Sequence, residues 1–302
     1  VTFTNCIFKQ NEAKSKGSVI YLKSNGNIEF HECVAYENIL TVTGSYYYGT
    51  TSAGDGSVLY SEGPGSVVVS NCYFHNNTAG RGCFYLASIA ISVSVVNTQF
   101  IHNKAYSNGG AIYRTSGFSS GPAKLVHIKN CTFANNVADK GGAIFIKRAR
   151  NTSISNCIFK QNQAKVSAGA IYFDDIDGAI MIENTIFDEN VALKDHGGSL
   201  YAELYYKAKY THFAINNSTL TNNFAQKDGG GMYMKGYEYH QLFIALHLKN
   251  LVFKNNSATL SGGGIYSDFV HLIGVSLRFN ENGAGVQGGA VYLEDSGIES
   301  SV

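Results

Sequence analysis

Tryptophan is absent from the 302 residues, proline occurs only twice, and neither sign of charge is in excess. The 23 basic and 22 acidic residues leave a net charge of +1, which provides no electrostatic footprint for nucleic acid or an anionic membrane. The sequence also lacks an apolar run of about 18 residues, the length that a membrane-spanning helix needs. We therefore expect no nucleic-acid partner and no membrane span in this segment.

Glycine is abundant although proline is scarce, with 33 glycines against 2 prolines. Because loop-rich chains normally use both residues, these glycines are expected to serve tight turns or close backbone approach inside a regular structure. The 20 tyrosines and 18 phenylalanines suit pleated, half-buried strands. The composition predicts an all-β protein.

Two motifs alternate along the chain, ten copies of each. One is a run of small residues followed by an aliphatic and an aromatic residue, as in GGAIY at 109–113 and GGAVY at 288–292. The other is Phe-x-x-Asn, often preceded by Asn-Cys, as in NCTFANN ending at Asn136. Each unit contains two runs with period-2 alternation joined by Asn/Gly turns. Since a unit of about 30 residues cannot bury a hydrophobic face alone, the units must stack as parallel strands around one core.

Three positions of the repeat define columns that run through the stacked units. The aliphatic position, represented by Ile144, is always apolar and is the expected core. The final asparagine of Phe-x-x-Asn can satisfy turn backbone groups and bond the asparagine one coil above. This predicted asparagine ladder comprises Asn11, Asn38, Asn77, Asn103, Asn136, Asn162, Asn190, Asn223, Asn256 and Asn282.

The aromatic position of the first motif forms a third column. Rings about 4.8 Å apart would stack and hide their faces, which favours a structural role over ligand binding. Whether this column faces inward or outward stays open. The predicted aromatic ladder comprises Tyr21, Tyr60, Tyr85, Tyr113, Phe145, Tyr172, Tyr201, Tyr233, Tyr266 and Tyr292.

The alternation of GGAIY with NCTFANN resembles the repeat pair of the polymorphic outer-membrane protein family, Gly-Gly-Ala-aliphatic with Phe-x-x-Asn. That family belongs to the pectin-lyase-like group of β-helices, and the resemblance spans residues 6–292. It implies a right-handed single-stranded parallel β-helix, here of about ten coils, with structural or adhesive roles at a surface. The first three coils depart from the pattern, because Ser18, Ser57 and Cys83 interrupt the glycine run.

Five of the six cysteines share one column, two residues before the Phe position. Stacked positions about 4.8 Å apart permit disulfides between adjacent coils, Cys6 with Cys33 and Cys131 with Cys157, while the other two would have to bridge within one coil. The alternative is a column of buried thiols. The sequence contains no Cys/His cluster of the kind that binds a metal. The candidates are Cys6, Cys33, Cys72, Cys83, Cys131 and Cys157.

Asn-x-Ser/Thr sequons occur six times and together favour a eukaryotic secretory product with N-linked glycans, located outside the cell or on its surface. An Asn-rich repeat generates sequons by chance, so any single one is weak. The candidate glycosylation sites are Asn76, Asn130, Asn151, Asn216, Asn217 and Asn255.

Polysaccharide lyases and hydrolases share the pectin-lyase-like fold, and their chemistry needs carboxylates converging on one face, with calcium or a general acid. No equivalent of their catalytic arginine or paired aspartates is recognisable, so we predict solvated turn residues and no catalytic residue, metal or cofactor. The residues weighed for this role are Asp174, Asp175 and Asp177 in YFDDIDG, Asp195 and His196 in KDHGG, and Lys147, Arg148 and Arg150 in IKRARN.

Tyrosine-rich loops are a separate candidate for ligand binding, because loops on the flank of a solenoid usually carry its binding residues. They contain Tyr46, Tyr47, Tyr48, Tyr205, Tyr206, Tyr210, Tyr237 and Tyr239.

Neither end of the chain has the pattern of a cap. Residues 288–302 read into residues 1–8 with the layout of the 141–159 repeat, so we expect one domain over 1–302 that is a segment of a longer chain or stacks head to tail. The expected partners are copies of itself or further β-helix segments. The sequence thus predicts an extracellular scaffold or surface fibre and not an enzyme. The alternatives are a carbohydrate-active enzyme and an adhesin that binds a polysaccharide or cell-surface ligand.

Overall fold

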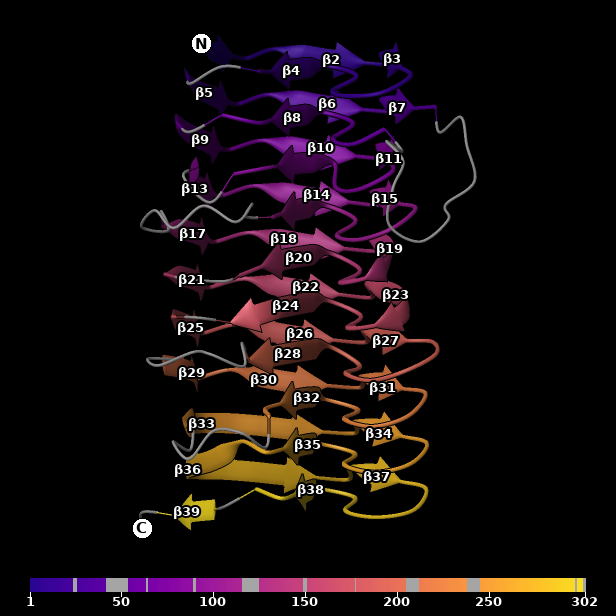
Figure 1. The fold of residues 1–302 in the computed structure, drawn as a ribbon, viewed down its shortest axis with the longest axis vertical. Coiled ribbons are helices and arrows are strands. Elements are labelled where there is room, and N and C mark those ends of the chain that lie inside the picture. Colours follow the sequence, from indigo (N-terminus) through magenta and orange to yellow (C-terminus); the bar gives the residue numbers. More distant parts are fainter. Residues whose placement is uncertain are drawn as a thin grey trace.

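The computed structural model is a coil of short parallel strands stacked along one axis (Figure 1). It describes residues 1–23, 26–41, 54–63, 65–88, 91–115, 125–148, 151–176, 178–204, 212–237, 245–296 and 298–300. Within these ranges the strands form one sheet of 19 strands and two of ten, and no helix. The predicted all-β, right-handed parallel β-helix of about ten coils is confirmed.

The first sheet is crossed twice by each coil. The first crossings are β1 (Thr2–Thr4), β5 (Gly26–His31), β9 (Gly65–Ser70), β13 (Ile91–Val96), β17 (Val126–Lys129), β21 (Thr152–Ser155), β25 (Ala179–Glu183), β29 (His212–Asn216) and β39 (Ile298–Ser300). The second crossings are β2 (Ile7–Lys9), β6 (Val34–Tyr36), β10 (Tyr73–His75), β14 (Gln99–Ile101), β18 (Thr132–Ala134), β22 (Ile158–Lys160), β26 (Ile186–Asp188) and β30 (Thr219–Thr221). Two strands make both crossings without a break, β33 (Ala245–Lys254) and β36 (His271–Asn280).

The second sheet follows the recurring turn at the Phe-x-x-Asn asparagine. It contains β3 (Glu12–Ala13), β7 (Ile39–Leu40), β11 (Thr78–Ala79), β15 (Lys104–Ala105), β19 (Val137–Lys140), β23 (Gln163–Ser167), β27 (Val191–Ala192), β31 (Phe224–Ala225), β34 (Ser257–Ala258) and β37 (Gly283–Ala284). Most of these strands have two residues, which is too short for a period-2 pattern to reveal. The sequence predicted only two runs per coil for this reason.

The third sheet contains the Gly-Gly motif. Its strands are β4 (Ile20–Leu22), β8 (Leu59–Ser61), β12 (Phe84–Leu86), β16 (Ile112–Arg114), β20 (Ile144–Lys147), β24 (Ile171–Ile176), β28 (Leu200–Leu204), β32 (Met232–Lys235), β35 (Ile265–Asp268) and β38 (Val291–Glu294). Each strand pairs in parallel with its copy in the next coil, so that Ile144 lies beside Ile171 and Phe145 beside Tyr172.

The core lies inside the coil, between the first and third sheets. The predicted aliphatic column contributes to it, with Ile144 and Ile171 fully buried. Across from it, the phenylalanines of Phe-x-x-Asn stack ring on ring, and the centroids of Phe133 and Phe159 are 4.8 Å apart. The expected core column is confirmed.

The two glycines of the Gly-Gly motif have different structural roles. Gly197 has a φ of 72°, a left-handed conformation that favours glycine. Gly198 passes so close to the next coil that an added Cβ would lie 2.0 Å from the carbonyl oxygen of Gly230. The pair therefore turns the chain and then lets adjacent coils approach. Among the described residues, no helix is long and apolar enough to cross a membrane.

Candidate functional site

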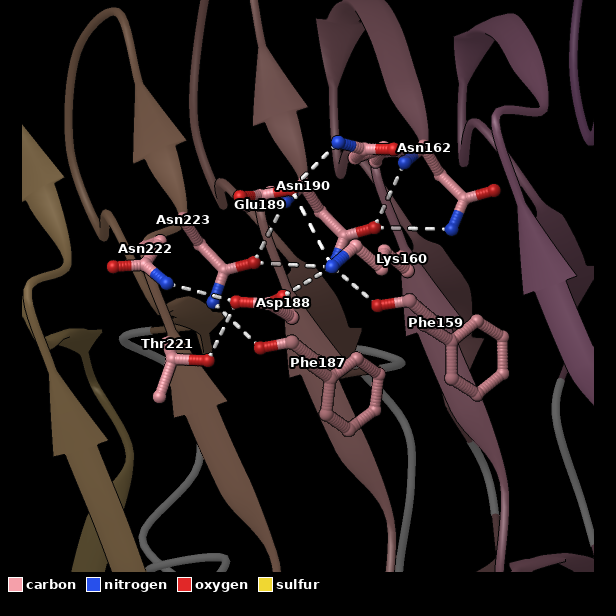
Figure 2. Close-up of polar contacts among 11 residues, drawn as sticks. Phe159, Lys160, Asn162, Phe187, Asp188, Glu189, Asn190, Thr221, Asn222 and Asn223 are labelled. Atoms are coloured by element: carbon pink, nitrogen blue, oxygen red, sulfur yellow. Dashed lines mark hydrogen bonds and ion pairs between the residues drawn. The ribbon is translucent and has the colours of Figure 1, made fainter.

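The asparagine ladder occupies the corner between the second crossing of the first sheet and the second sheet. Figure 2 shows three of its members, Asn162, Asn190 and Asn223, each bonded to its copy in the adjacent coil. From Asn11 to Asn282 the Nδ2-to-Oδ1 distances lie between 2.8 and 3.1 Å. All ten predicted asparagines therefore lie in one column without a gap.

Each of the eight inner ladder amides makes hydrogen bonds to both neighbouring coils. Nδ2 of Asn190 donates to Oδ1 of Asn223 and also to the carbonyl of Phe159 at 2.9 Å. Oδ1 of Asn223 also accepts the backbone N–H of Asn190 at 2.9 Å. These side chains are fully buried in the eight inner coils. Their hydrogen bonds stabilise the corner, and no ligand can reach them.

A polar group outside this corner, seen in Figure 2, is centred on Asp188. Its Oδ1 accepts from Oγ1 of Thr221 at 2.8 Å and Nδ2 of Asn222 at 2.9 Å, and Lys160 lies 3.1 Å from Oδ2. Burial alone would raise the pKa of Asp188, but these three neighbours outweigh it and lower the pKa. Asp188 therefore stays ionised, and Lys160, Thr221 and Asn222 stabilise its negative charge.

The aromatic ladder faces away from the core, on the outer side of the third sheet. Phe145 lies between the core residues Ile144 and Ile146 in β20, and successive side chains of a strand point to opposite faces. From Tyr60 to Tyr266 the ring centroids are 4.4 to 5.1 Å apart with interplanar angles of at most 17°. These eight rings are only 4 to 8% exposed. The aromatic column therefore faces outward, and the stacked neighbours cover the faces of its rings.

A polar column lies immediately before the glycine run and covers one side of the aromatic rings. Lys16, Arg81 and Lys140 place their charges 4.6, 4.9 and 5.0 Å from the ring centroids of Tyr60, Tyr85 and Tyr172, respectively. Sequence reasoning missed this column. Its signal was available in the recurrence of a polar residue before the first glycine. Its members are Lys16, Asp55, Arg81, Asn108, Lys140, Ser167, His196, Asp228, Ser261 and Gln287.

Two contacts between polar side chains of this column link adjacent coils. Arg81 makes a bidentate pair with Asp55, at 2.9 and 2.6 Å. Nδ1 of His196 lies 3.1 Å from Oδ2 of Asp228, whose Oδ1 accepts the backbone N–H of Ser261 at 2.9 Å. The His196 ring also lies against Tyr233, with centroids 4.5 Å apart. Within this column, Arg81 is therefore paired with Asp55, and His196 lies against Asp228 of the adjacent coil.

A second column, two residues after each aromatic residue, contains one of the acids weighed for catalysis, Asp174. Asp174 pairs with Lys147 at 2.7 Å, and Glu203 lies 3.9 Å from Lys235. Burial raises the pKa of Asp175, and the neighbouring charge of Asp174 adds to this shift. The carboxylate of Asp268 has a pKa raised to about 6, by burial first and then by Glu294.

The two acidic motifs are not brought together into one site. Asp174 belongs to the column two residues after the aromatic ring, with Asp175 next to it in the chain, whereas His196 lies in the column before the glycine run. Asp195 pairs with Lys227 at 2.7 Å instead. Within the described ranges, no three His, Cys, Asp or Glu side chains are placed to hold a metal ion. Asp177 and Arg150 lie outside the described residues.

The cysteine column is a column of hydrogen-bond donors. Cys131 donates its thiol to the carbonyl two residues earlier at 3.1 Å, and Thr185 and Ser218 make the same bond with their hydroxyls at 2.9 and 2.7 Å. All six cysteines are free thiols here, and the disulfides stay a prediction. Burial raises the pKa of Cys72 to about 11, which keeps its thiol protonated and unreactive. Cys83 lies elsewhere, beside Ser57 and directly before the third-sheet strand β12.

The sequon asparagines lie at surface corners, with one exception. Asn76, Asn130, Asn151, Asn217 and Asn255 are exposed, and Asn216 is half-buried at the end of β29. Of the loop tyrosines, the structure describes Tyr237, whose hydroxyl donates to Glu203. The other seven, at 46–48, 205–206, 210 and 239, lie outside the described residues.

Comparison with known proteins places this geometry in a family. The family model described as "Right handed beta helix region" matches residues 89–299, which is more than half of the chain. "Metabotropic glutamate receptor-like protein R" of Dictyostelium discoideum is 30% identical over 183 residues, covering 52% of this chain and 11% of the relative. "Probable autotransporter YfaL" of Escherichia coli (strain K12) is 31% identical over 177 residues, covering 50% of this chain and 14% of the relative.

The chain thus spans 11% and 14% of the lengths of these two curated relatives. No solved structure matches it. The family match and the parallel sheets agree on the same architecture. The chain belongs to the right-handed β-helix family.

Proposed function

We propose that the chain is a rigid rod segment of an extracellular or cell-surface scaffold, such as a fibre, stalk or appendage. The observation that carries this proposal is the unbroken asparagine ladder from Asn11 to Asn282. Bonds of this kind between identical side chains stiffen a stack along its axis, as in cross-β assemblies. The aromatic ladder runs parallel to it on the opposite sheet.

The relatives support a place at the cell surface. One is named a probable autotransporter and the other a receptor-like protein. The resemblance of the GGAIY and NCTFANN repeats to polymorphic outer-membrane proteins points the same way. The proposal extends this location to the present chain.

A structural role, with no catalysis and no cofactor, is part of the proposal. Its support is the pairing of the candidate acids with cations of their own, Asp174 with Lys147 and Asp195 with Lys227. An acid that cleaves a glycosidic bond must instead face the substrate with its partner carboxylate nearby. Ion pairs of this kind suit a solvated structural surface.

The proposed partners are further β-helix coils, in the same parent chain or in a second copy. In the first coil Phe3 and Phe8 are only partly buried, and in the last complete coil so is Phe279. The equivalent Phe133 in the middle of the rod is fully buried. Another coil stacked on either face would bury the partly exposed rings.

The experiment is surface proteolysis of intact source cells, followed by cryo-electron microscopy of the released native material. We expect peptides of this chain in the released fraction and rods with an axial repeat of about 4.8 Å per coil. Retention of the chain inside protease-treated cells would contradict the location. Discrete particles with a covered end would contradict the fibre.

A second candidate is an adhesin, and one contact favours it. The hydroxyl of the loop residue Tyr237 donates to Glu203, beside the aromatic ladder. This contact places one tyrosine of a predicted binding loop next to the column of charged residues that follows the aromatic ladder. Binding of the purified chain to a polysaccharide array, lost in Tyr237→Ala and kept in Tyr36→Ala, would favour this candidate.

A further inference from the structure

Five of the six sequon asparagines occupy left-handed corners of the coil. Their φ angles are 54° at Asn76 and Asn130, 47° at Asn151, 48° at Asn217 and 52° at Asn255. Asparagine tolerates this conformation better than most residues. All five are exposed, so an asparagine favoured by the left-handed turn is also a sequon asparagine at the surface.

The glycosylated atom of an asparagine is Nδ2, and Asn217 leaves this atom uncommitted. Among the described residues, the one hydrogen bond of its side chain is received by Oδ1, from Nδ2 of Asn250 at 2.9 Å. At Asn130 and Asn255, Nδ2 donates a single bond, to Oδ1 of Asn97 at 3.1 Å and of Asn222 at 3.3 Å. Because a glycosylated amide keeps one N–H, these bonds can persist beside a glycan.

Asn216 differs from its neighbour although their sequons overlap. It ends β29, is half-buried, and its carbonyl accepts the N–H of Asn184 at 3.1 Å and Oγ of Ser218 at 2.7 Å. Ser218, the hydroxyl residue of its sequon, is 2% exposed and also accepts the N–H of Thr185 at 3.0 Å. The sequon of Asn217 uses the half-exposed Thr219 instead.

We propose that the four sequon corners with described residues on both sides, Asn76, Asn130, Asn217 and Asn255, carry N-linked glycans and that Asn216 does not. The inference rests on the proposed extracellular location, reached through a eukaryotic secretory pathway. Transfer forms a bond between Nδ2 and the anomeric carbon of an oligosaccharide. It breaks the bond from that carbon to the pyrophosphate of a lipid-linked donor, and releases the lipid pyrophosphate and an amide proton.

These four glycans would shield one face of the rod and leave another bare. Asn130 and Asn217 lie where the first crossing of the first sheet turns into the second, and Asn76 and Asn255 lie where the second crossing ends. The glycans therefore border the second-crossing strands. Asn76 and Asn255 are six coils apart, about 29 Å at 4.8 Å per coil. Among the described residues, no sequon asparagine lies in a strand of the third sheet, so none of these glycans starts on the face with the aromatic ladder.

The test is glycopeptide mapping of the whole chain secreted from a eukaryotic host behind an added signal peptide. Enzymatic release of the glycans in ¹⁸O-water marks each occupied asparagine as a labelled aspartate. We expect labels at the four corner asparagines. The matched variants are Asn217→Gln, which should lose one glycan, and Asn216→Gln, which should lose none.

Thr219→Ala provides a second variant, because it removes the sequon of Asn217 and leaves that of Asn216 intact. It should lose the same glycan as Asn217→Gln. A glycan at Asn216 in the unaltered chain, or a secreted and folded chain with bare corners, would overturn the inference. Either result leaves the proposed location standing, since that is decided separately by proteolysis of intact source cells.

Discussion

Asn190 donates one amide hydrogen forward to Oδ1 of Asn223 at 3.0 Å and the other backward to the carbonyl of Phe159 at 2.9 Å. One side chain thus connects three successive coils. Since its surroundings exclude water, a lost partner cannot be replaced by solvent. This arrangement makes the ladder the part of the rod most sensitive to substitution.

Asn190→Ala should lower the free energy of unfolding by about 3 kcal/mol. The change removes several buried hydrogen bonds and leaves Nδ2 of Asn162 without its acceptor on the next coil. Urea denaturation followed by circular dichroism measures the shift. The control is Asn184→Gly at an exposed corner with a φ of 50°, which should change stability by less than about 0.5 kcal/mol. Equal effects of the two variants would refute a special role for the ladder.

Tyr201→Ala should destabilise the chain by roughly 3 kcal/mol, because it removes a ring packed between Tyr172 at 4.4 Å and Tyr233 at 5.1 Å. Tyr201→Phe keeps the stack and should cost much less, as Phe145 already occupies the same column. Thermal unfolding compares the two variants. If Phe and Ala were equally damaging, the hydroxyl and not the stacked ring would be the stabilising group.

Asp268 should make the stability depend on pH below neutrality. Its pKa of about 6 in the folded state exceeds the ordinary value of 3.8, so the folded state binds the proton more tightly. Stability from this group is therefore present at low pH, falls as pH rises from about 4 to 6, and is flat above that range. Asp268→Asn should remove this slope and raise the melting temperature at pH 7, because it relieves repulsion by Glu294.

Asp188→Asn is the matched control for that titration. The pKa of Asp188 is lowered by Asn222, Thr221 and Lys160 against the effect of burial, so its contribution is present at neutral pH and is lost on acidification. The variant should be less stable than the parent chain at pH 7, the opposite sign to Asp268→Asn. Identical pH profiles for both variants would contradict the assigned environments.

Cys157→Thr should be tolerated within about 1 kcal/mol, because Thr185 makes the equivalent bond in the next coil. Cys157→Val keeps the volume but loses the donor and should cost more. Thiol titration of the denatured chain, purified without reductant, should count six free cysteines. A count of four, two or none would establish one, two or three of the disulfides considered from the sequence.

The sequence predicted the repeat, the all-β class, and the membership of the core and asparagine columns. These features depend on spacing within one coil, such as the three residues from Phe187 to Asn190, which a single sequence displays directly. The short strands of the second sheet were missed because two residues cannot show a period. The column of charges over the aromatic rings was missed because its residue type changes from Lys16 to Asp55 to Arg81.

The sequence by itself therefore determined that identical positions stack, since only stacking buries an apolar face that each unit carries alone. Tertiary structure alone decided what those positions contact. The outward stacking of Tyr201, the pairing of Asp174 with Lys147, and the bond that the backbone N–H of Cys157 donates to Oγ1 of Thr185 all depend on an adjacent coil. Those partners lie about 27 to 29 residues away in the chain, and the faces they present are fixed only when the coils come into register.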